Sequence, residues 1–178
     1  MTNEQFVEDL GEMTAHGSPE LVLSPSKINA WLECDHYLEL VQFVEDGHLD
    51  QPDDAHNPFV QLLLDKGLQH EAECLEDYES NGFGIYRVPE REDDESFDQW
   101  VERVGNPLED GHDVVYQLPV THDGIRGVID FVVRDQSAPA GTVRYEPVDA
   151  KLTRKEAKVG HVVQLCFYAE AVGALTGS

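Results

Sequence analysis

The fold is decided by residues 124–151, which read GIRGVIDFVVRDQSAPAGTVRYEPVDAK. Apolar and polar residues largely alternate across 124–134 and again across 142–151, a pattern typical of half-buried β-strands. Serine, proline and glycine in the intervening residues 135–141 favour a turn. The stretch therefore predicts two antiparallel strands joined as a hairpin.

The register of this hairpin brings two acids together. If residue 134 pairs with residue 145, then Asp130 lies opposite Asp149, because paired positions in an antiparallel ladder keep a constant sum. Lys151 follows two residues after Asp149, so both side chains project from the same face of the strand. One place in the predicted sheet would thus carry two carboxylates and an ammonium group.

The flanking segments complete one domain, over residues 21–178, of the α/β class with a mixed central sheet flanked by helices. Residues 1–20 are a polar leader, and residues 45–58 a loop that follows the first helix. A hydroxyl in Ser24-Pro25-Ser26 is a candidate cap for that helix. Further strands are predicted at 84–88 and 114–120, and helices at 26–44, 59–78, 95–104 and 156–175.

The charge balance is unusual, with 36 acidic and 12 basic residues and a formal charge of −24. Such a protein suits a salt-rich cytoplasm, because molar salt screens the repulsion among its carboxylates. The same charge disfavours general affinity for nucleic-acid backbones. A local exception is a basic strip formed by Lys151, Arg154, Lys155 and Lys158, which holds four of the 12 cations.

Membrane and disulfide chemistry are not indicated. No apolar run approaches the ~20 residues that span a bilayer, and the acidic N-terminus lacks the features of a signal peptide, so we expect a cytoplasmic protein without a membrane partner. Cys34, Cys74 and Cys166 are widely spaced and odd in number, which predicts free, buried thiols. Cys166 lies in an apolar run and is predicted to be a core residue.

Asp130, Asp149 and Lys151 together predict a metal site. Two acids and a base on one strand face are costly to bury unless they share a cation, and Mg²⁺ or Mn²⁺ takes carboxylate oxygens while retaining waters. A metal-acidified water can hydrolyse a phosphodiester, and Lys151 could orient that water or stabilise the developing charge. The alternative interpretation of Asp-x-Lys alone is a surface ion pair.

The order of these motifs resembles a known family. Residues 23–34 (LSPSKINAWLEC) and 145–152 (YEPVDAKL) are similar to the opening helix and central strand of the RecB-like nucleases of the PD-(D/E)XK superfamily, which include helicase-coupled and CRISPR-associated exonucleases. The resemblance runs from Leu23 to Thr176 and implies a restriction-endonuclease-like core. It also implies that His70, Asp130 and Asp149 hold the metal, that Lys151 is catalytic, and that Gln164 and Tyr168 support DNA handling. By the same resemblance Glu71 is a candidate support residue behind the ligands, whereas a solvated glutamate on the helix surface is the commoner interpretation of such a residue.

Two departures from the family pattern shape the expectations. Relatives with an iron-sulfur cluster use an N-terminal cysteine and three C-terminal ones; Cys34 fits the first place, but no cysteine follows Cys166, so we expect no cluster. A further strand should follow the Gln164-x-x-x-Tyr168 helix, whereas this sequence stops at Ser178. We therefore expect the core to lack its last strand and the chain to be the N-terminal part of a longer protein with a helicase or further C-terminal domain.

Three functions compete at this stage. The leading hypothesis is a Mg²⁺- or Mn²⁺-dependent DNA nuclease that acts at ends or on single strands, in repair, recombination or defence. The alternative is a non-catalytic module of the same fold that binds nucleic acid or a helicase. A hydrolase of small phosphoesters would use the acids but would leave Gln164, Tyr168 and the basic strip without a role.

Overall fold

The centre of the protein is a four-stranded mixed sheet. The computed structural model describes residues 23–50, 58–139, 141–151 and 158–177, so the predicted leader lies outside it. The strands run in the order β1-β2-β3-β4, with β1 parallel to β2 and the other neighbours antiparallel. Their bounds are β1 (Ile85–Arg87), β2 (Val114–His122), β3 (Ile125–Arg134) and β4 (Tyr145–Val148).

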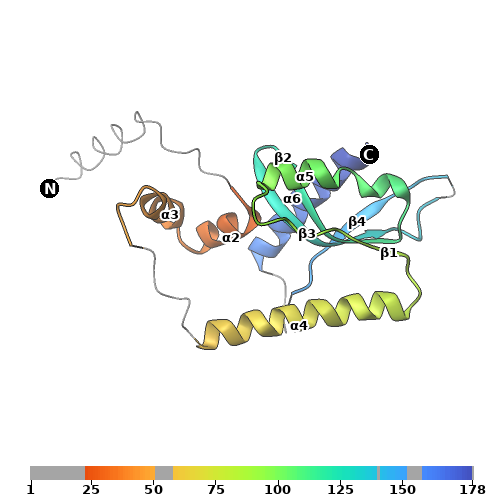
Figure 1. Ribbon diagram of the computed structural model, residues 1–178, viewed down its shortest axis with the longest axis horizontal. Helices are drawn as coiled ribbons and strands as arrows, with labels where there is room; N and C mark the ends of the chain where they lie inside the picture. Colours follow the sequence, from red (N-terminus) through yellow and green to blue (C-terminus); the bar gives the residue numbers. More distant parts are fainter. Residues whose placement is uncertain (1–22, 51–57, 140, 152–157, 178) are drawn as a thin grey trace.

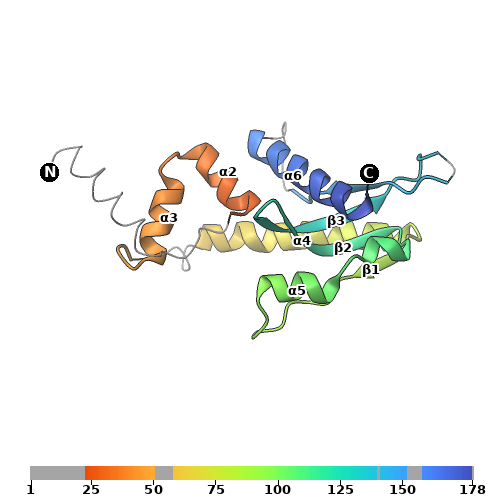
Figure 2. The same ribbon diagram turned by 90° about the horizontal axis from the view of Figure 1, so that it is seen from above.

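Helices cover both faces of this sheet (Figures 1 and 2). One face packs against α4 (Pro58–Ser80), through a cluster centred on Leu75, Val114 and Phe131. The other face packs against α5 (Phe97–Val104), the short 3₁₀ helix η2 (Pro107–Asp110) and α6 (Val159–Thr176), and these elements bury the larger cluster. That cluster includes Trp100, Leu108, Val115, Leu118, Ile129, Val132, Phe167, Tyr168, Ala171 and Val172. The predicted mixed sheet flanked by helices is therefore confirmed.

The single helix predicted at 26–44 is wrong, because the chain forms two helices there. They are α2 (Pro25–Glu33) and α3 (Tyr37–Glu45), separated where Cys34 adopts an extended conformation with φ −152° and ψ 110°. Cys34, Asp35 and His36 are all weak helix formers, which favours a break at this point. The predicted hydroxyl cap is confirmed, since the Ser24 side chain accepts a hydrogen bond from the Lys27 backbone N–H at 3.2 Å.

The β3–β4 hairpin has the predicted register. Arg134 pairs with Tyr145 and Phe131 with Val148, so the next position in the series brings residue 130 opposite residue 149. The β4 strand is shorter than the predicted 142–151, and it ends at Val148. It ends there because the next backbone donor, the N–H of Ala150, is taken by the Asp130 side chain rather than by a strand carbonyl.

The β2–β3 ladder contains an interruption that the alternating pattern did not predict. It passes from the pair Tyr116–Phe131 to the pair Leu118–Ile129, with Gln117 and Asp130 between them. Gln117 has a φ of 61°, a left-handed conformation that costs a non-glycine residue free energy.

On both strands the side chains change the face of the sheet from which they project at this interruption. Before it on β2, Val115 faces α6 and Tyr116 faces α4, yet Leu118 again faces α6. On β3, Ile129 faces α6 whereas Phe131 faces α4. Because side chains two apart in a regular strand share a face, each strand has one residue more than regular alternation requires.

The cysteines are free, as predicted, but the prediction that they are buried is wrong. Cys34 and Cys166 are exposed, and Cys74 is partly buried. The α6 helix is apolar around most of its circumference, so the sequence could not show that Phe167 and Tyr168 face the sheet while Cys166 faces away. By length and composition alone α6 could span a membrane, although here it packs part of its surface against the sheet.

Candidate functional site

Asp130 and Asp149, termed the acid pair below, meet where β3 and β4 diverge. The Asp130 Oδ2 atom accepts a hydrogen bond from the Ala150 backbone N–H at 2.8 Å. This bond ties the chain around Asp149 to β3 just beyond the last ladder pair, so the acid pair is held by main-chain geometry. The predicted register of the two acids is thereby confirmed, and a metal ion shared between them stays a prediction.

Asp149 is deeply buried and already has two donors. Its side chain is 3% exposed, and its Oδ1 atom lies 3.0 Å from Lys151 Nζ. The same oxygen accepts a hydrogen bond from Gln164 Nε2, on α6, at 3.1 Å. The Lys151 side chain is 38% exposed, so its ammonium joins the buried acid to the surface. A surface ion pair is thus too simple a description, because one partner is inside the protein.

The electrostatics disfavour a charge on Asp130. Burial is the largest cause that raises the pKa of Asp130 to about 6, and the negative charges of Asp149 and Glu71 add to it. The Ala150 N–H and the Lys151 ammonium act in the opposite direction, because they stabilise the ionised form. Three acidic residues, Asp130, Asp149 and Glu71, thus lie near the single ammonium group of Lys151. Acidic groups therefore outnumber basic groups in this region.

The α4 helix contributes Glu71 to this region. The Glu71 carboxylate accepts hydrogen bonds from the Tyr116 hydroxyl, at 2.7 Å, and from the Gln117 amide. Burial and this carboxylate raise the pKa of Tyr116 to about 12. Through Gln117 the carboxylate holds the strand at the interruption beside Asp130. Glu71 therefore joins α4 to the strand opposite Asp130, and it is not the solvated glutamate that its place on a helix would more commonly indicate.

His70 occupies a different environment in this structure. Its Nε2 atom lies 3.9 Å from the sulfur of Cys74, one turn along α4. Among the described residues it makes no hydrogen bond or ion pair with either member of the acid pair. Its predicted role as a metal ligand stays a prediction.

Gln164 and Tyr168 both face inward from α6. The Tyr168 hydroxyl donates to the backbone carbonyl of Val128 at 2.9 Å, and the side chain is buried. A Cβ atom at Gly127 would lie 2.9 Å from Tyr168 Cε1, so only glycine leaves room for this contact. Burial and the nearby acid pair raise the pKa of Tyr168 to about 12. Both side chains contact protein groups here, and their predicted part in DNA handling stays a prediction.

The acid pair suits a hard divalent cation in its chemistry, though not as a complete cage. Among the described residues no three His, Cys, Asp or Glu side chains form a group that could hold a metal ion. Mg²⁺ is commonly bound by only one or two carboxylates, together with waters and substrate phosphates. One carboxylate from β3 and one from the residue after β4 meet that lesser requirement, and a cation would offset their mutual repulsion.

The basic strip is described only in part. Arg154 and Lys155 lie outside the described residues. Lys158 is exposed and forms an ion pair with Glu33 of α2 at 3.0 Å. Lys151 turns toward Asp149, so the two described lysines at its ends are each paired with an acid.

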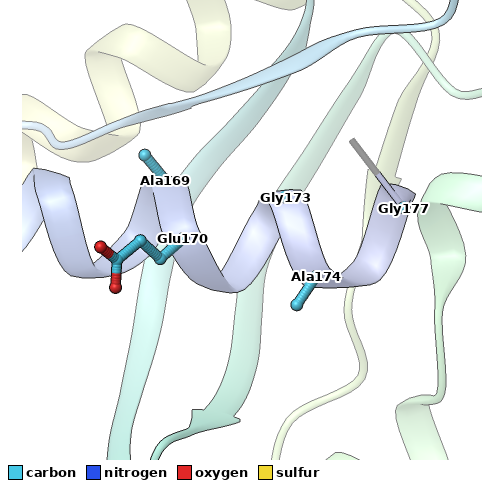
Figure 3. Close-up of a pocket in the computed structure, with 5 residues that line it drawn as sticks. All are labelled: Ala169, Glu170, Gly173, Ala174 and Gly177. Atoms are coloured by element: carbon cyan, nitrogen blue, oxygen red, sulfur yellow. The ribbon is translucent and has the colours of Figure 1, made fainter.

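A surface pocket on α6 is unrelated to the acid pair. Figure 3 shows a shallow pocket on α6 lined by Ala169, Glu170, Gly173, Ala174 and Gly177. It contains none of the residues predicted for the site.

Sequence reasoning missed three members of the site: Asn29, Tyr116 and Gln117. Asn29 donates from α2 to Gln164 at 3.3 Å, although 135 positions separate the two residues. The polar Gln117 within an apolar strand was a signal that could have been followed. Searches of protein-family models, curated proteins and solved structures found no match to this chain.

Proposed function

We propose that the protein is a metal-dependent deoxyribonuclease of the RecB-like type, with a restriction-endonuclease-like core. The observation that carries the proposal is that Asp149, just beyond the end of β4, lies near Asp130 of β3 and is paired with the partly exposed Lys151. The motif order described from the sequence supports it, since the helix with His70, the strand with Asp130 and the Asp149-x-Lys151 segment occur in the family's order.

The chain's own groups would divide the work as follows. Asp130 and Asp149 would hold Mg²⁺ or Mn²⁺, which would supply a Lewis acid and an acidified water. The Ala150 N–H favours the ionised form of Asp130 that such binding requires. Lys151 would turn its ammonium from Asp149 to a phosphate oxygen and stabilise the charge that develops there.

Other residues would keep this arrangement in place. Gln164 restrains Asp149 Oδ1, and Glu71 anchors the strand opposite Asp130 through Gln117. His70, one residue before Glu71 on α4, keeps the ligand role that the family resemblance implies. In that role His70 would bind the same cation as Asp130 and Asp149.

The surroundings of this activity are also part of the proposal. A formal charge of −24 makes non-specific retention of DNA weak, so the metal and the lysines near the site would contribute most of the phosphate affinity. A helicase or a further domain that supplies DNA contacts would fit this distribution, in a salt-rich cytoplasm.

The test is degradation of end-labelled single- and double-stranded DNA, with Mg²⁺, Mn²⁺ or EDTA, at low and molar KCl. We expect cleavage only with a divalent cation. Asp149→Ala should abolish it, whereas Lys151→Ala should keep Mn²⁺ affinity but lose about 10²- to 10³-fold in turnover. Lys66→Ala, which removes an exposed α4 lysine bonded to Gln69, is the matched control.

Three results would contradict the proposal. Full activity in Lys151→Ala would remove the assigned role of the lysine. DNA binding without divalent-dependent cleavage by the wild type would instead favour the non-catalytic module. Hydrolysis of a small phosphoester without DNA cleavage would favour the third class.

A further inference from the structure

A chain of hydrogen bonds leads from α2 to the buried acid. Asn29 Nδ2 donates to Gln164 Oε1 at 3.3 Å, and Gln164 Nε2 donates to Asp149 Oδ1 at 3.1 Å. Asn29 lies on α2, Gln164 on α6 and Asp149 just beyond β4, so the hydrogen bonds join three distant parts of the sequence. The Gln164 amide is the middle member of the chain, because its carbonyl oxygen accepts from Asn29 and its NH₂ group donates to Asp149.

The direction of this chain follows from the acid at its end. An ionised carboxylate can only accept hydrogen bonds, so Gln164 must present its NH₂ group to Asp149. Its carbonyl oxygen then points to α2 and requires a donor, which Asn29 supplies with its own NH₂ group. The remaining Asn29 oxygen, Oδ1, is buried, and in the described structure it has no hydrogen-bond partner.

That unsatisfied oxygen indicates that the orientation of Asn29 is determined elsewhere. A buried acceptor without a partner costs free energy, and reversing the Asn29 amide would relocate that oxygen. Reversal would also set two carbonyl oxygens against each other, or else reverse Gln164 and place its oxygen against Asp149. The free-energy cost of the unsatisfied Asn29 oxygen is therefore offset by the hydrogen bond that Gln164 donates to Asp149.

Space for this arrangement comes from Gly160, in the first turn of α6. A Cβ atom there would lie 2.5 Å from Asn29 Oδ1 and 2.8 Å from its Cγ. Glycine within a helix is unfavourable relative to alanine. Its presence permits the close approach of Asn29 to α6.

We infer that Asn29 is a positioning residue, which orients the Gln164 amide so that its NH₂ group holds Asp149. The inference rests on the proposed function for its consequence, since the held acid is a proposed metal ligand. Asn29 itself acts only through Gln164.

The first test follows the Gln164 side-chain amide by ¹⁵N NMR, assigned with Gln164→Leu. In Asn29→Ala the NH₂ signals should move toward the position of a free glutamine. In Asn29→Asp they should move differently, because a carboxylate at position 29 competes with Asp149 for the same NH₂ group. The control is Asn81→Ala, which removes an exposed asparagine bonded to a backbone carbonyl of its own helix. Unchanged Gln164 signals in Asn29→Ala would overturn the inference.

The second test separates positioning from stability. Asn29→Ala should weaken Mn²⁺ affinity by about 3- to 10-fold, less than the roughly 10- to 100-fold that follows loss of a ligand's own supporting contact, because Asn29 acts through Gln164. The double variant Asn29→Ala/Gly160→Ala loses the 2.5 and 2.8 Å contacts at position 160, keeps one of 3.3 Å with the Cβ atom of residue 29, and gains helix propensity, so it should melt no lower than Asn29→Ala. If its Mn²⁺ affinity nonetheless stays weakened, Asn29 acts by positioning. Recovery of wild-type affinity with stability would show a merely structural role and overturn the inference.

The two proposals can fail separately. A wild-type protein that binds no Mn²⁺ contradicts the proposed function, and the Gln164 signals then decide the role of Asn29 alone. A wild-type protein that cleaves DNA, with Gln164 signals and Mn²⁺ affinity unmoved by Asn29→Ala, contradicts only the role of Asn29.

Discussion

Replacing Asp130 by asparagine should stabilise the metal-free protein at neutral pH. Burial raises the pKa of Asp130 from its ordinary 3.8 to about 6, so the folded protein holds a proton there that the unfolded chain has already released. Stability therefore falls as the pH rises from about 4 to about 6, and the full penalty applies above that window. The asparagine side chain would keep an oxygen for the Ala150 N–H while carrying no charge.

The magnitude follows from the two pKa values. The interval between 3.8 and about 6 corresponds to about 3 kcal/mol. Because Asp130 is partly open to solvent, we reduce this to roughly 1–2 kcal/mol. For a chain of 178 residues that is a rise of about 2 to 8 °C in Tm.

The assay is thermal unfolding of wild type and Asp130→Asn at fixed KCl with EDTA, at pH 7.5 and pH 4. The exposed acid of Asp93→Asn controls for the general loss of one negative charge. We expect the Asp130→Asn gain at pH 7.5 to exceed that of the control and to disappear at pH 4. Mg²⁺ should stabilise the wild type more than the variant. An equal or lower Tm for Asp130→Asn at pH 7.5 would refute the reasoning.

Three further predictions concern the scaffold. Gly127→Ala should lower stability in urea by about 1–3 kcal/mol, because its Cβ would lie 2.9 Å from Tyr168 Cε1, and an unchanged unfolding midpoint would show that α6 yields easily. Glu71→Ala should cost about 2–4 kcal/mol in the same assay, since it leaves the Tyr116 hydroxyl without its acceptor, while the exposed neighbour variant Glu73→Ala should cost far less; equal losses would exclude an anchoring role. Tm should rise as KCl approaches molar concentration, because salt screens 36 acidic side chains, and a flat or falling Tm would end the salt-adaptation hypothesis.

The parts of the fold that depend on neighbouring residues could be predicted from sequence. The Ser24 cap acts within one helical turn, and the hairpin register follows from a short turn and a constant sum. Both are decided by local geometry. The position of Asp130 relative to Asp149 was therefore accessible before the structure.

The remainder depends on contacts that local patterns do not encode. Adjacent residues on a helix point about 100° apart. Whether His70 or Glu71 faces the sheet is therefore a matter of how α4 packs. Gln117 adopts a left-handed conformation that its residue type does not predict. Asn29 contacts Gln164 only once α2 and α6 have packed together.

The interruption between β2 and β3 places Asp130 at a position that regular pairing of the two strands does not require. Deleting Gln117 and Asp130 together would join Tyr116–Phe131 directly to Leu118–Ile129 and restore regular alternation on both strands. Deleting only one would shift the pairing beyond that point by one residue and break the match between the two strands. Gln117 and Asp130 thus have the character of a paired insertion: removal of both leaves the pairing on either side intact, whereas removal from one strand alone does not.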